Sequence, residues 1–558
     1  MAITKVDLAN VVTGVLPVAN GGTGTSSGVS PGGSNTQVQY NSSGTFAGDA
    51  DFTFNGTTVT MANDASISGL TVGKGTSSST NNTVVGQNAL TTNSTGSANC
   101  AFGQYALYTA NADANSAFGQ AALYLNSSGA SNSAFGYQAL RNNTTASNNT
   151  AVGYQAGYSN TTANHNLFMG YTTGYTNSTG TANTFVGSTV GYSNTTGNGN
   201  AAFGSNYVGV ALPTFYYNST GSYNSAFGVG ALASNTTAPA NTAVGFQAAY
   251  TQTTAIETVA VGYQALYANT GNSNNAFGYQ SLYANTSGGS NSGFGHKTLL
   301  ANTTGNENTA IGFAGMLSNT TGSSNVSVGF RALQNNTTAS NNTAVGYQAA
   351  YSNTTGYESV YVGYQAGYAL TTGVHNVYLG FQAGNNTTTG NGNVCIGKLA
   401  KPSGATTSDE IVMGANTTGK GGNTGFINPS GGGVYQGNNS SSWSTTSDQR
   451  LKKNIVDNNI GLEVLSQIQV RNFEYRLPEE VDAELKPTDA INKTGVQLGV
   501  IAQELQQVLP ECVKQETTGV LSVDPDNLTW YLVNAVKQLK ADNDAMKAAL
   551  KSAGIPGF

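Results

Sequence analysis

The 558-residue sequence has little charge, few cysteines and no long apolar run. Charged residues make up 8% of the chain, far below the share of roughly 25% in ordinary globular domains, and a net charge of −6 offers no basic stripe for nucleic acid. Three cysteines lie far apart, at Cys100, Cys395 and Cys512, so we expect neither a disulfide framework nor a zinc site. The absence of an 18-residue apolar stretch and of a basic start followed by an apolar core predicts no membrane insertion and no signal peptide.

What the chain does contain is 72 glycines, 29 tyrosines and 20 phenylalanines, with abundant Asn, Thr and Ser. Disordered segments are poor in aromatic residues, so this composition indicates an ordered repeat with glycine and asparagine at fixed turns. Charge is distributed unevenly, because residues 447–558 hold 28 of the 46 charged residues. That change of composition predicts a domain boundary near residue 447.

The first part of the chain carries two different patterns. Residues 1–35 include Gly-Gly and Ser-rich runs and predict a linker with an attachment segment for a larger particle, the alternative being a disordered tail. Residues 36–79 contain short β-like runs separated by Gly, Asn and Ser, among them the hairpin-forming pair Asn55-Gly56. We expect a small β-module there.

A repeat then occupies residues 80–415. It is aligned on one glycine per unit, the anchor glycine, which is preceded by an apolar residue twenty times from Val85-Gly86 to Met413-Gly414. The step is 17 residues almost everywhere, 16 twice, and 24 once between Gly204 and Gly228. Such a fixed period with one strand and one turn per unit predicts a parallel β-roll or β-solenoid.

A complete unit is N-N-T-A-V-G-Y-Q-A-A-Y-S-N-T-T-G-Y at residues 341–357. We expect A-V-G-Y-Q-A to form the strand, N-T-T-G the turn, and the apolar residue before the anchor glycine to form a ladder inside the coil. The anchor glycine is expected where backbones approach closely. A 17-residue coil encloses little core, and tyrosines such as Tyr137 and Tyr347 follow the anchor. We therefore expect side-by-side association as a trimer; a monomeric solenoid with a wet tyrosine face stays open.

The N-S-A-F-G and N-T-A-V-G units resemble the N-S-V-A-I-G repeats of YadA-type trimeric adhesin heads. The resemblance covers residues 80–415 and implies a parallel β-roll in each subunit, with three rolls around a common axis. The family repeat is shorter than 17 residues, so the turns here must be longer.

Two further features of the array are candidates for binding. The 24-residue step adds seven residues, and we expect a bulged loop there whose exposed aromatic side chains contact a receptor or, equally, pack on the trimer. The candidate contact residues are Pro213, Phe215, Tyr216 and Tyr217. The histidines His165, His296 and His375 are isolated along the array, so no metal site and no cofactor are expected. Residues 416–446 predict a Gly/Asn/Ser-rich tip.

The boundary itself has the sequence S-D-Q-R-L-K-K-N-I at residues 447–455. A serine hydroxyl becomes a nucleophile when a base takes its proton, and a lysine can be that base if desolvation or positive neighbours lower its pKa. Ser447 and Lys452 lie five residues apart, with Arg450 and Lys453 nearby. Without further context a solvated basic turn explains the same residues.

The context is supplied by S-D-Q-R-L-K-K-N-I, F-E-Y-R, G-V-I-A-Q-E-L-Q-Q-V-L-P and W-Y-L-V-N-A-V-K-Q-L, which resemble the endosialidase-type intramolecular chaperone domain. That family stands at the C-terminus of phage tail spikes and fibres, where it trimerises, assists folding of the preceding β-structure and cleaves itself off. The resemblance implies cleavage of the bond between Thr446 and Ser447, with Ser447 as nucleophile and Lys452 as general base. Asp448 and Arg450 fall on motif positions with supporting roles.

Residues 447–558 also show a mixed pattern of their own. Strands are expected at 470–476 and 495–501, and helices at 502–508 and 528–551. The last helix has a heptad-like stripe with one polar layer, which predicts a trimeric coiled coil; one amphipathic helix docked on its own domain is the alternative. The stripe consists of Leu532, Val536, Leu539, Asn543, Met546 and Leu550.

Together these patterns predict a mainly β, elongated trimeric roll followed by a small α/β chaperone domain with a coiled-coil helix. The function that fits is a phage virion fibre for host recognition, assembled in the host cytoplasm, attached to the virion by its N-terminus and bound to a glycan or protein receptor. A cellular trimeric adhesin would need an export signal and a membrane anchor, which we do not expect here. A glycan-degrading spike would need grouped carboxylates. The acids of the array are scattered: Asp113, Glu257, Glu307, Glu358, Asp409 and Glu410.

Overall fold

The computed structural model describes residues 37–42, 45–55, 57–61, 64–75, 81–205, 209, 211–429, 433–437, 444–445, 447–482, 491, 493–515 and 519–557. The chain divides into two compact units, Met1–Thr446 and Ser447–Phe558. The division falls where the charge of the sequence rises. The predicted attachment segment and linker at residues 1–35 lie outside the described residues, and so does Thr446.

The first unit begins with short antiparallel strands. β1 (Gln37–Ser42), β2 (Thr45–Phe54) and β3 (Val59–Met61) form one sheet, and β4 (Ala65–Ile67) pairs with β5 (Leu70–Gly73) as a hairpin. β5 then pairs with the first strand of the array. Asp64 closes this entry, because its carboxylate accepts hydrogen bonds from the backbone N–H groups of Lys74 (2.6 Å) and Gly75 (2.7 Å).

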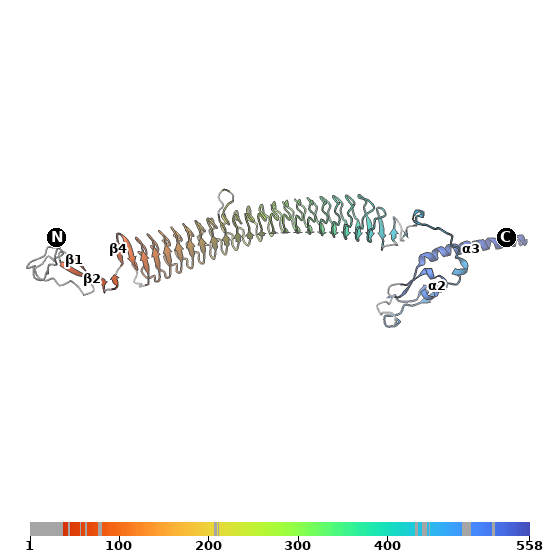
Figure 1. Cartoon of the computed structure of the whole chain (residues 1–558), viewed down its shortest axis with the longest axis horizontal. Coiled ribbons are helices and arrows are strands. Elements are labelled where there is room, and N and C mark those ends of the chain that lie inside the picture. The colour runs from red at the N-terminus through yellow and green to blue at the C-terminus, as the bar shows by residue number, and fades with distance from the viewer. Residues whose placement is uncertain are drawn as a thin grey trace, which may run out of the picture. The chain divides into compact units, whose positions relative to one another are not determined.

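The repeat forms the parallel ladder that the 17-residue period predicts (Figure 1). One strand of three residues, or of four in the last unit, precedes each anchor glycine, and each strand pairs in register with the strands before and after it in the chain. The strands are β6 (Thr83–Val85), β7 (Cys100–Phe102), β8 (Ser116–Phe118), β9 (Ser133–Phe135), β10 (Thr150–Val152), β11 (Leu167–Met169), β12 (Thr184–Val186), β13 (Ala201–Phe203), β14 (Ser225–Phe227), β15 (Thr242–Val244), β16 (Val259–Val261), β17 (Asn275–Phe277), β18 (Ser292–Phe294), β19 (Thr309–Ile311), β20 (Val326–Val328), β21 (Thr343–Val345), β22 (Val360–Val362), β23 (Val377–Leu379), β24 (Val394–Ile396) and β25 (Glu410–Met413).

Backbone hydrogen bonds also join successive coils outside the strands. In the turns, for example, the N–H of Thr337 donates to the carbonyl of Thr354 over 3.0 Å. The predicted close approach at the anchor glycines is confirmed. Gly346 has φ +139°, and a Cβ on it would overlap the carbonyl oxygen of Gly363 in the next coil. A side chain at this position would therefore separate the coils.

The interior of the coil is built on a different residue from the one expected. The fully buried position is the middle of each strand, the inner ladder, which is usually alanine, as at Ala134 and Ala344. The apolar residue before the anchor glycine points outward and is partly or well exposed, 40% at Phe135 and 44% at Leu379. Placing that residue inside was wrong. The coil is so narrow that its core takes a methyl group, and the larger apolar residue occupies the outer face.

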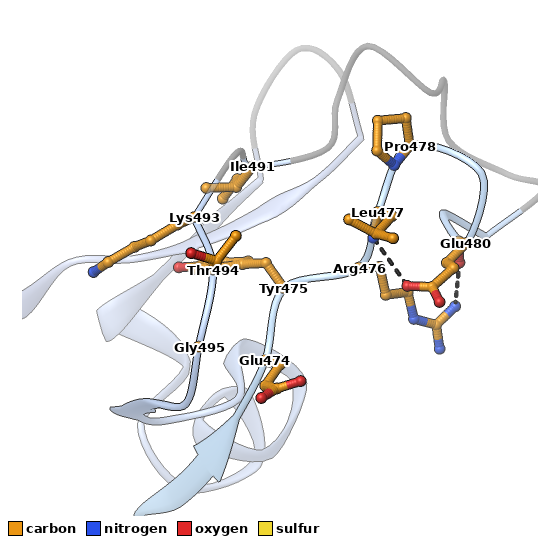
Figure 2. Close-up of a pocket in the computed structure, with 10 residues that line it drawn as sticks. All are labelled: Glu474, Tyr475, Arg476, Leu477, Pro478, Glu480, Ile491, Lys493, Thr494 and Gly495. Carbon is orange, nitrogen blue, oxygen red and sulfur yellow. Dashed lines mark hydrogen bonds between the residues drawn. The ribbon is translucent and has the colours of Figure 1, made fainter.

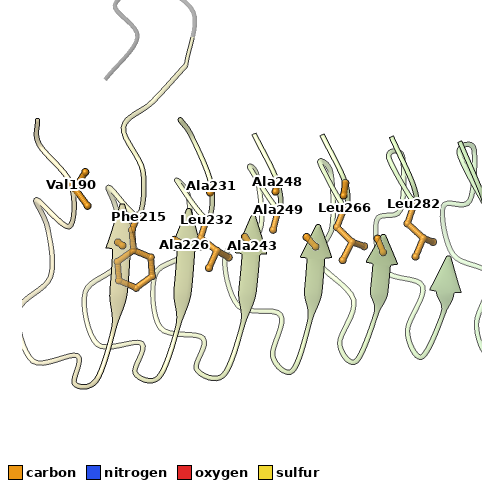
Figure 3. Packing of buried hydrophobic residues seen from close by; sticks show 14 of the residues in the cluster. Val190, Phe215, Ala226, Ala231, Leu232, Ala243, Ala248, Ala249, Leu266 and Leu282 are labelled. Atoms are coloured by element: carbon orange, nitrogen blue, oxygen red, sulfur yellow. The ribbon is translucent and has the colours of Figure 1, made fainter. Parts of the chain in front are cut away.

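The core is filled by matched pairs of large and small residues (Figure 3). Opposite the small inner-ladder alanines, the position four residues after the anchor glycine is mostly Leu or Ala, with Met316 opposite Ala310 and Gly157 opposite Ala151. Where the inner ladder has a large ring instead, that opposite position is glycine, as in Tyr361 with Gly367 and Phe168 with Gly174. A Cβ on Gly367 would lie 2.5 Å from Cδ1 of Tyr361, so the two positions share one fixed volume.

Two ladders of buried asparagines satisfy the backbone at the turns. Asn302 donates from Nδ2 to Oδ1 of Asn285 (2.7 Å) and to the carbonyl of Gly305 (3.0 Å), and the pattern recurs along the array. In the second ladder the backbone N–H of Asn308 donates to Oδ1 of Asn291 over 3.0 Å. Buried amides with such partners stabilise the turns, because most of these polar groups keep their hydrogen bonds without water. The exceptions are Oδ1 of Asn235 and of Asn353, where the next rung is Gln252 or Leu370. The N-T-T-G motif recurs at a fixed position of the repeat because its asparagine belongs to the first of these ladders.

The array ends on a buried carboxylate rather than an asparagine. Glu410 accepts hydrogen bonds from the N–H of Ser403 (2.7 Å) and the N–H of Gly421 (2.6 Å), and it caps the second asparagine ladder. We expected an extended tip over residues 416–446. The described part of that range instead continues the ladder, in parallel through β26 (Thr424–Ile427) and then antiparallel through β27 (Val434–Gln436) and β28 (Ser444–Thr445).

The second unit is small and mixed. Its elements are η2 (Gln449–Leu451), α1 (Leu462–Leu465), β29 (Arg471–Phe473), β30 (Gln497–Gly499), α2 (Ala502–Val508), η4 (Pro510–Cys512), β31 (Val513–Gln515), β32 (Leu521–Val523) and α3 (Pro525–Ser552). β29 pairs with β30, and β31 with β32, both antiparallel. The predicted helix at 502–508 is confirmed, while the strands are shorter than expected.

The core of this unit lies between α2, η4 and the first turns of α3. Leu505, Leu509, Cys512 and Tyr531 are buried, and Tyr531 donates its hydroxyl hydrogen to Oε1 of Glu511 over 2.6 Å. This contact raises the pKa of Tyr531 to about 12, chiefly through the hydrogen bond to the carboxylate and then through burial. α3 thus docks on its own domain by one face only.

Candidate functional site

The turn at the start of the second unit brings the predicted nucleophile and base together. η2 folds the chain back after Ser447, so that Nζ of Lys452 donates a hydrogen bond to the Ser447 hydroxyl oxygen over 2.7 Å. A nucleophile and base in hydrogen-bond contact are the geometry that proton transfer requires. Their catalytic roles stay predictions, and the bond to be cut includes Thr446, which lies outside the described residues.

Asp448 and Arg450 hold this turn in shape. Asp448 is the N-cap of η2, and its Oδ1 accepts from the backbone N–H of Arg450 over 2.8 Å. The Arg450 guanidinium returns to the same carboxylate, with Nη2 2.6 Å from Oδ2. The side-chain and backbone hydrogen bonds from Arg450 lower the pKa of Asp448, and the same contact raises the pKa of Arg450. The exposed ion pair stabilises little by itself, and the supporting role of Asp448 and Arg450 stays a prediction.

A lysine accepts a proton only when it is neutral, and exclusion of water favours the neutral form. Ser447 and Lys452 are both exposed in the single chain. Apolar side chains beside them are also exposed, 75% at Leu451, 64% at Ile455 and 83% at Val456. A surface that packs on these side chains would remove water from the Ser447–Lys452 pair.

The predicted coiled-coil stripe lies on a face of α3 that its own domain leaves uncovered. Leu532, Val536, Leu539 and Met546 are between 56% and 59% exposed. The docked face is instead formed by Tyr531 and Ala535, with Asn534 and Gln538 hydrogen-bonded to residues 458–462. The helix thus docks on its own domain by this face, and the coiled coil stays a prediction for the uncovered stripe.

The expected receptor contact at residues 213–217 requires a correction. Phe215 is fully buried. It fills the core position that, in a regular coil, lies four residues after the anchor glycine, and Pro213 is also buried. Tyr216 stacks on Tyr192 with ring centroids 5.4 Å apart, and Tyr217 is 46% exposed. The seven extra residues therefore fall at 205–211, before this segment, because residues 212–217 resume the regular coil.

The remaining candidates are the histidines of the array and one pocket of the second unit. Among the described residues no group of three or more His, Cys, Asp and Glu side chains could hold a metal ion. His165 and His375 lie in turns, with φ +61° and +58°, as their spacing predicts. A pocket of about 330 Å³ beside β29 and β30 is lined by Glu474, Tyr475, Arg476, Leu477, Pro478, Glu480, Ile491, Lys493, Thr494 and Gly495 (Figure 2). These ten residues include no Ser, Cys or His, and Arg476 is bonded to the Glu480 carbonyl over 3.2 Å.

Comparison with known proteins points to the same segment. Residues 447–514 match a family described as the chaperone of endosialidase. No solved structure matches the chain. No described helix is long and apolar enough to cross a membrane. A β-solenoid of 17-residue repeats followed by this domain fits a phage tail fibre with a C-terminal chaperone domain.

Proposed function

We propose that this chain, a tail fibre with an endosialidase-type chaperone domain, works as a homotrimer that recognises the host surface after its chaperone has cut itself off. The N-terminal segment attaches the fibre to a virion protein, and the receptor is a glycan or protein of the host. The fibre therefore belongs to the virion and is assembled in the host cytoplasm. The observation that carries the proposal is the Ser447–Lys452 contact within a segment that matches the chaperone family.

Trimerisation of the array is supported by its outer face. The outer apolar ladder, formed by the residue before every anchor glycine, runs beside the outer aromatic ladder, formed by the Tyr or Phe that follows eleven of the twenty anchor glycines. Rings of the aromatic ladder stack from coil to coil, as at Tyr347 and Tyr364 with centroids 5.0 Å apart. About thirty half-exposed apolar side chains at roughly 70 Å² each leave on the order of 2,000 Å² of apolar surface. That exceeds the largest patch of a typical monomer severalfold, so other copies must cover it.

Trimerisation of the chaperone domain is supported by the uncovered stripe of α3. Three such helices would bury Leu532, Val536 and Leu539 against each other and set Asn543 as a polar layer that fixes register. A thin parallel ladder has many non-local contacts and assembles slowly. A C-terminal clamp that first aligns three chains reduces the entropy cost of starting the ladder.

Self-cleavage would proceed by acyl transfer to the serine. The Ser447 hydroxyl oxygen attacks the carbonyl carbon of Thr446, and its proton passes to neutral Lys452. The C–N bond breaks, Lys452 returns the proton to the Ser447 amino group, and water then hydrolyses the ester. Packing of a second copy on Leu451, Ile455 and Val456 would exclude water and favour neutral Lys452, so cleavage follows trimerisation.

The test compares Ser447→Ala and Lys452→Arg with wild type after expression of the full chain. Wild type should yield fragments of about 446 and 112 residues, whereas both variants should stay whole. Lys452→Arg keeps the charge and the donor but cannot become neutral, so it isolates the base. Ser466→Ala, an exposed serine of the same unit, is the matched control and should be cut like wild type. Wild type that trimerises and stays intact would contradict the proposed cleavage.

A further inference from the structure

Two cations stand by themselves on the long array. Lys297 and Arg331 are the only Lys or Arg residues between positions 142 and 397. Each is the second residue after an anchor glycine, so both occupy one corner of the coil, two coils apart, with Ala314 on the coil between them. The stacking is direct, because the N–H of Ala314 donates to the carbonyl of His296 and the N–H of Arg331 to that of Phe313, each over 2.9 Å. Two coils correspond to roughly 10 Å.

Among the described residues neither cation donates a hydrogen bond to a side-chain acceptor. The Arg331 guanidinium lies over the Phe330 ring, 5.0 Å from its centroid, and its Nε is buried without a hydrogen-bond partner among the described residues. Nδ1 of His296, the residue before Lys297, is also buried and has no hydrogen-bond partner among the described residues. In the described part of the chain neither Lys297 nor Arg331 forms an ion pair. Nζ of Lys297 lies 5.9 Å from the centroid of the Tyr279 ring on the preceding coil, so its flexible side chain has to turn toward Ala314 for one anion at that height to contact both cations.

The array carries a matching anion on a different corner. Glu307 lies five residues before the anchor glycine Gly312, on the same coil as Ala314. Its carboxylate accepts a hydrogen bond only from the Ser324 hydroxyl, over 3.2 Å, among the described residues. Glu358, at the same position of a later coil, is already paired with His375 over 3.0 Å. Glu307 is thus the acid whose height falls midway between Lys297 and Arg331.

Three-fold packing would bring the two corners together. In a cyclic trimer the contact is heterologous, so one flank of each chain meets the opposite flank of the next, at equal height. If the outer apolar and aromatic ladders face the axis, the corner of Lys297 lies on one flank and the corner of Glu307 on the other. The coil number of Glu307 then places it level with Ala314 of the neighbouring copy.

We propose that Glu307 of one copy binds between Lys297 and Arg331 of the next copy, and that this contact fixes the register of the three arrays. The inference rests on the proposed trimer. Register needs such a device, because every coil presents an apolar residue to the outer face and a slip by one whole coil keeps the apolar contacts. A slip would, however, move Glu307 away from at least one of the two cations.

The experiment uses zero-length carbodiimide coupling on purified wild-type fibre, which joins a lysine amine to a carboxylate in contact with it. Boiled denaturing gels should show covalent dimers and trimers, and mass spectrometry should find a peptide linking Lys297 to Glu307. Lys297→Arg keeps the charge but offers no coupling amine, so the link should vanish while the trimer persists. Glu257 and Glu358 occupy the same corner at other heights and should not couple to Lys297.

The outcomes separate this inference from the proposed function. A protein that sediments as a trimer without the Lys297–Glu307 link overturns the clamp and leaves the trimer standing. A protein that sediments as a monomer overturns both. Binding of heparin, an anionic glycan probe, that is lost in Lys297→Gln and Arg331→Gln, without any link to Glu307, would assign the two cations to an external ligand and overturn the clamp.

Discussion

The fit between Tyr361 and Gly367 allows a worked test of the core. In Gly367→Ala the new Cβ would lie 2.5 Å from Cδ1 and 2.7 Å from Cε1 of Tyr361, inside a fully buried space. Forcing an extra carbon into such a core costs about 1–3 kcal/mol. The backbone there has φ +62°, and an alanine in that region costs about 1–2 kcal/mol more. The free energy of unfolding should fall by about 2–5 kcal/mol per chain.

The chain supplies the matched control. The coil before it has Ala344 opposite Ala350, and Ala350 itself has φ +51°, so an alanine pair fits this backbone. Tyr361→Ala alone leaves a cavity beside glycine and should cost about 3–5 kcal/mol. The double variant Tyr361→Ala/Gly367→Ala should lose less than the sum of the single losses, by at least about 2 kcal/mol.

The assay is guanidinium unfolding followed by circular dichroism, with unfolding rates measured beside midpoints because a large fibre can unfold irreversibly. A Gly367→Ala fibre as stable as wild type would refute the shared-volume reasoning. So would single losses that simply add in the double variant.

Three further predictions concern the outer face, the last helix and alkaline pH. Leu379→Glu on the outer apolar ladder should prevent trimer formation, because three buried carboxylates would meet without partners, whereas Thr372→Glu on an exposed turn of the array should sediment like wild type. Val536→Asp should leave uncut, monomeric chains on gels, since it places a charge in the coiled-coil stripe. The hydrogen bond from Tyr531 to Glu511 stabilises the chaperone unit fully below pH 10, the ordinary pKa of tyrosine, and its contribution is lost as pH rises through about 12. The difference in thermal midpoint between wild type and Tyr531→Phe should therefore shrink as pH rises from 10 to about 12. A difference that stays constant over this range would contradict the stabilising role of the Tyr531–Glu511 hydrogen bond.

The repeat could be predicted from the sequence because glycine leaves a strong signal at a fixed period. The anchor glycines, the parallel ladder and α2 follow from spacing, turn residues and apolar periodicity. The pairing of Ser447 with Lys452 was implied by the resemblance to the endosialidase-type chaperone, because the spacing alone fits a solvated basic turn equally well. The remaining site assignments depended on which side of a strand each residue faces.

Which residues of a strand face the core could not be predicted correctly, for a physical reason. In a three-residue strand the middle side chain points to one face and its two neighbours to the other. An error of one residue in the assignment therefore exchanges core and surface positions. Larger apolar residues were assigned to the core, whereas a 17-residue coil has room for alanine at positions such as Ala344. The signal that would have helped is the exchange of large inner residues with glycine, as at Phe168 with Gly174. The same shift hid Phe215, whose place in the core emerges once residues 212–217 are aligned to the coil.

The most direct test of a trimeric fibre that removes its own chaperone combines sedimentation with N-terminal sequencing of the products from wild-type expression. The account predicts a trimer of chains that end at Thr446, and a released chain of 112 residues whose first residue is Ser447. A monomeric product, an uncut 558-residue chain, or a released fragment that begins at another residue would contradict it.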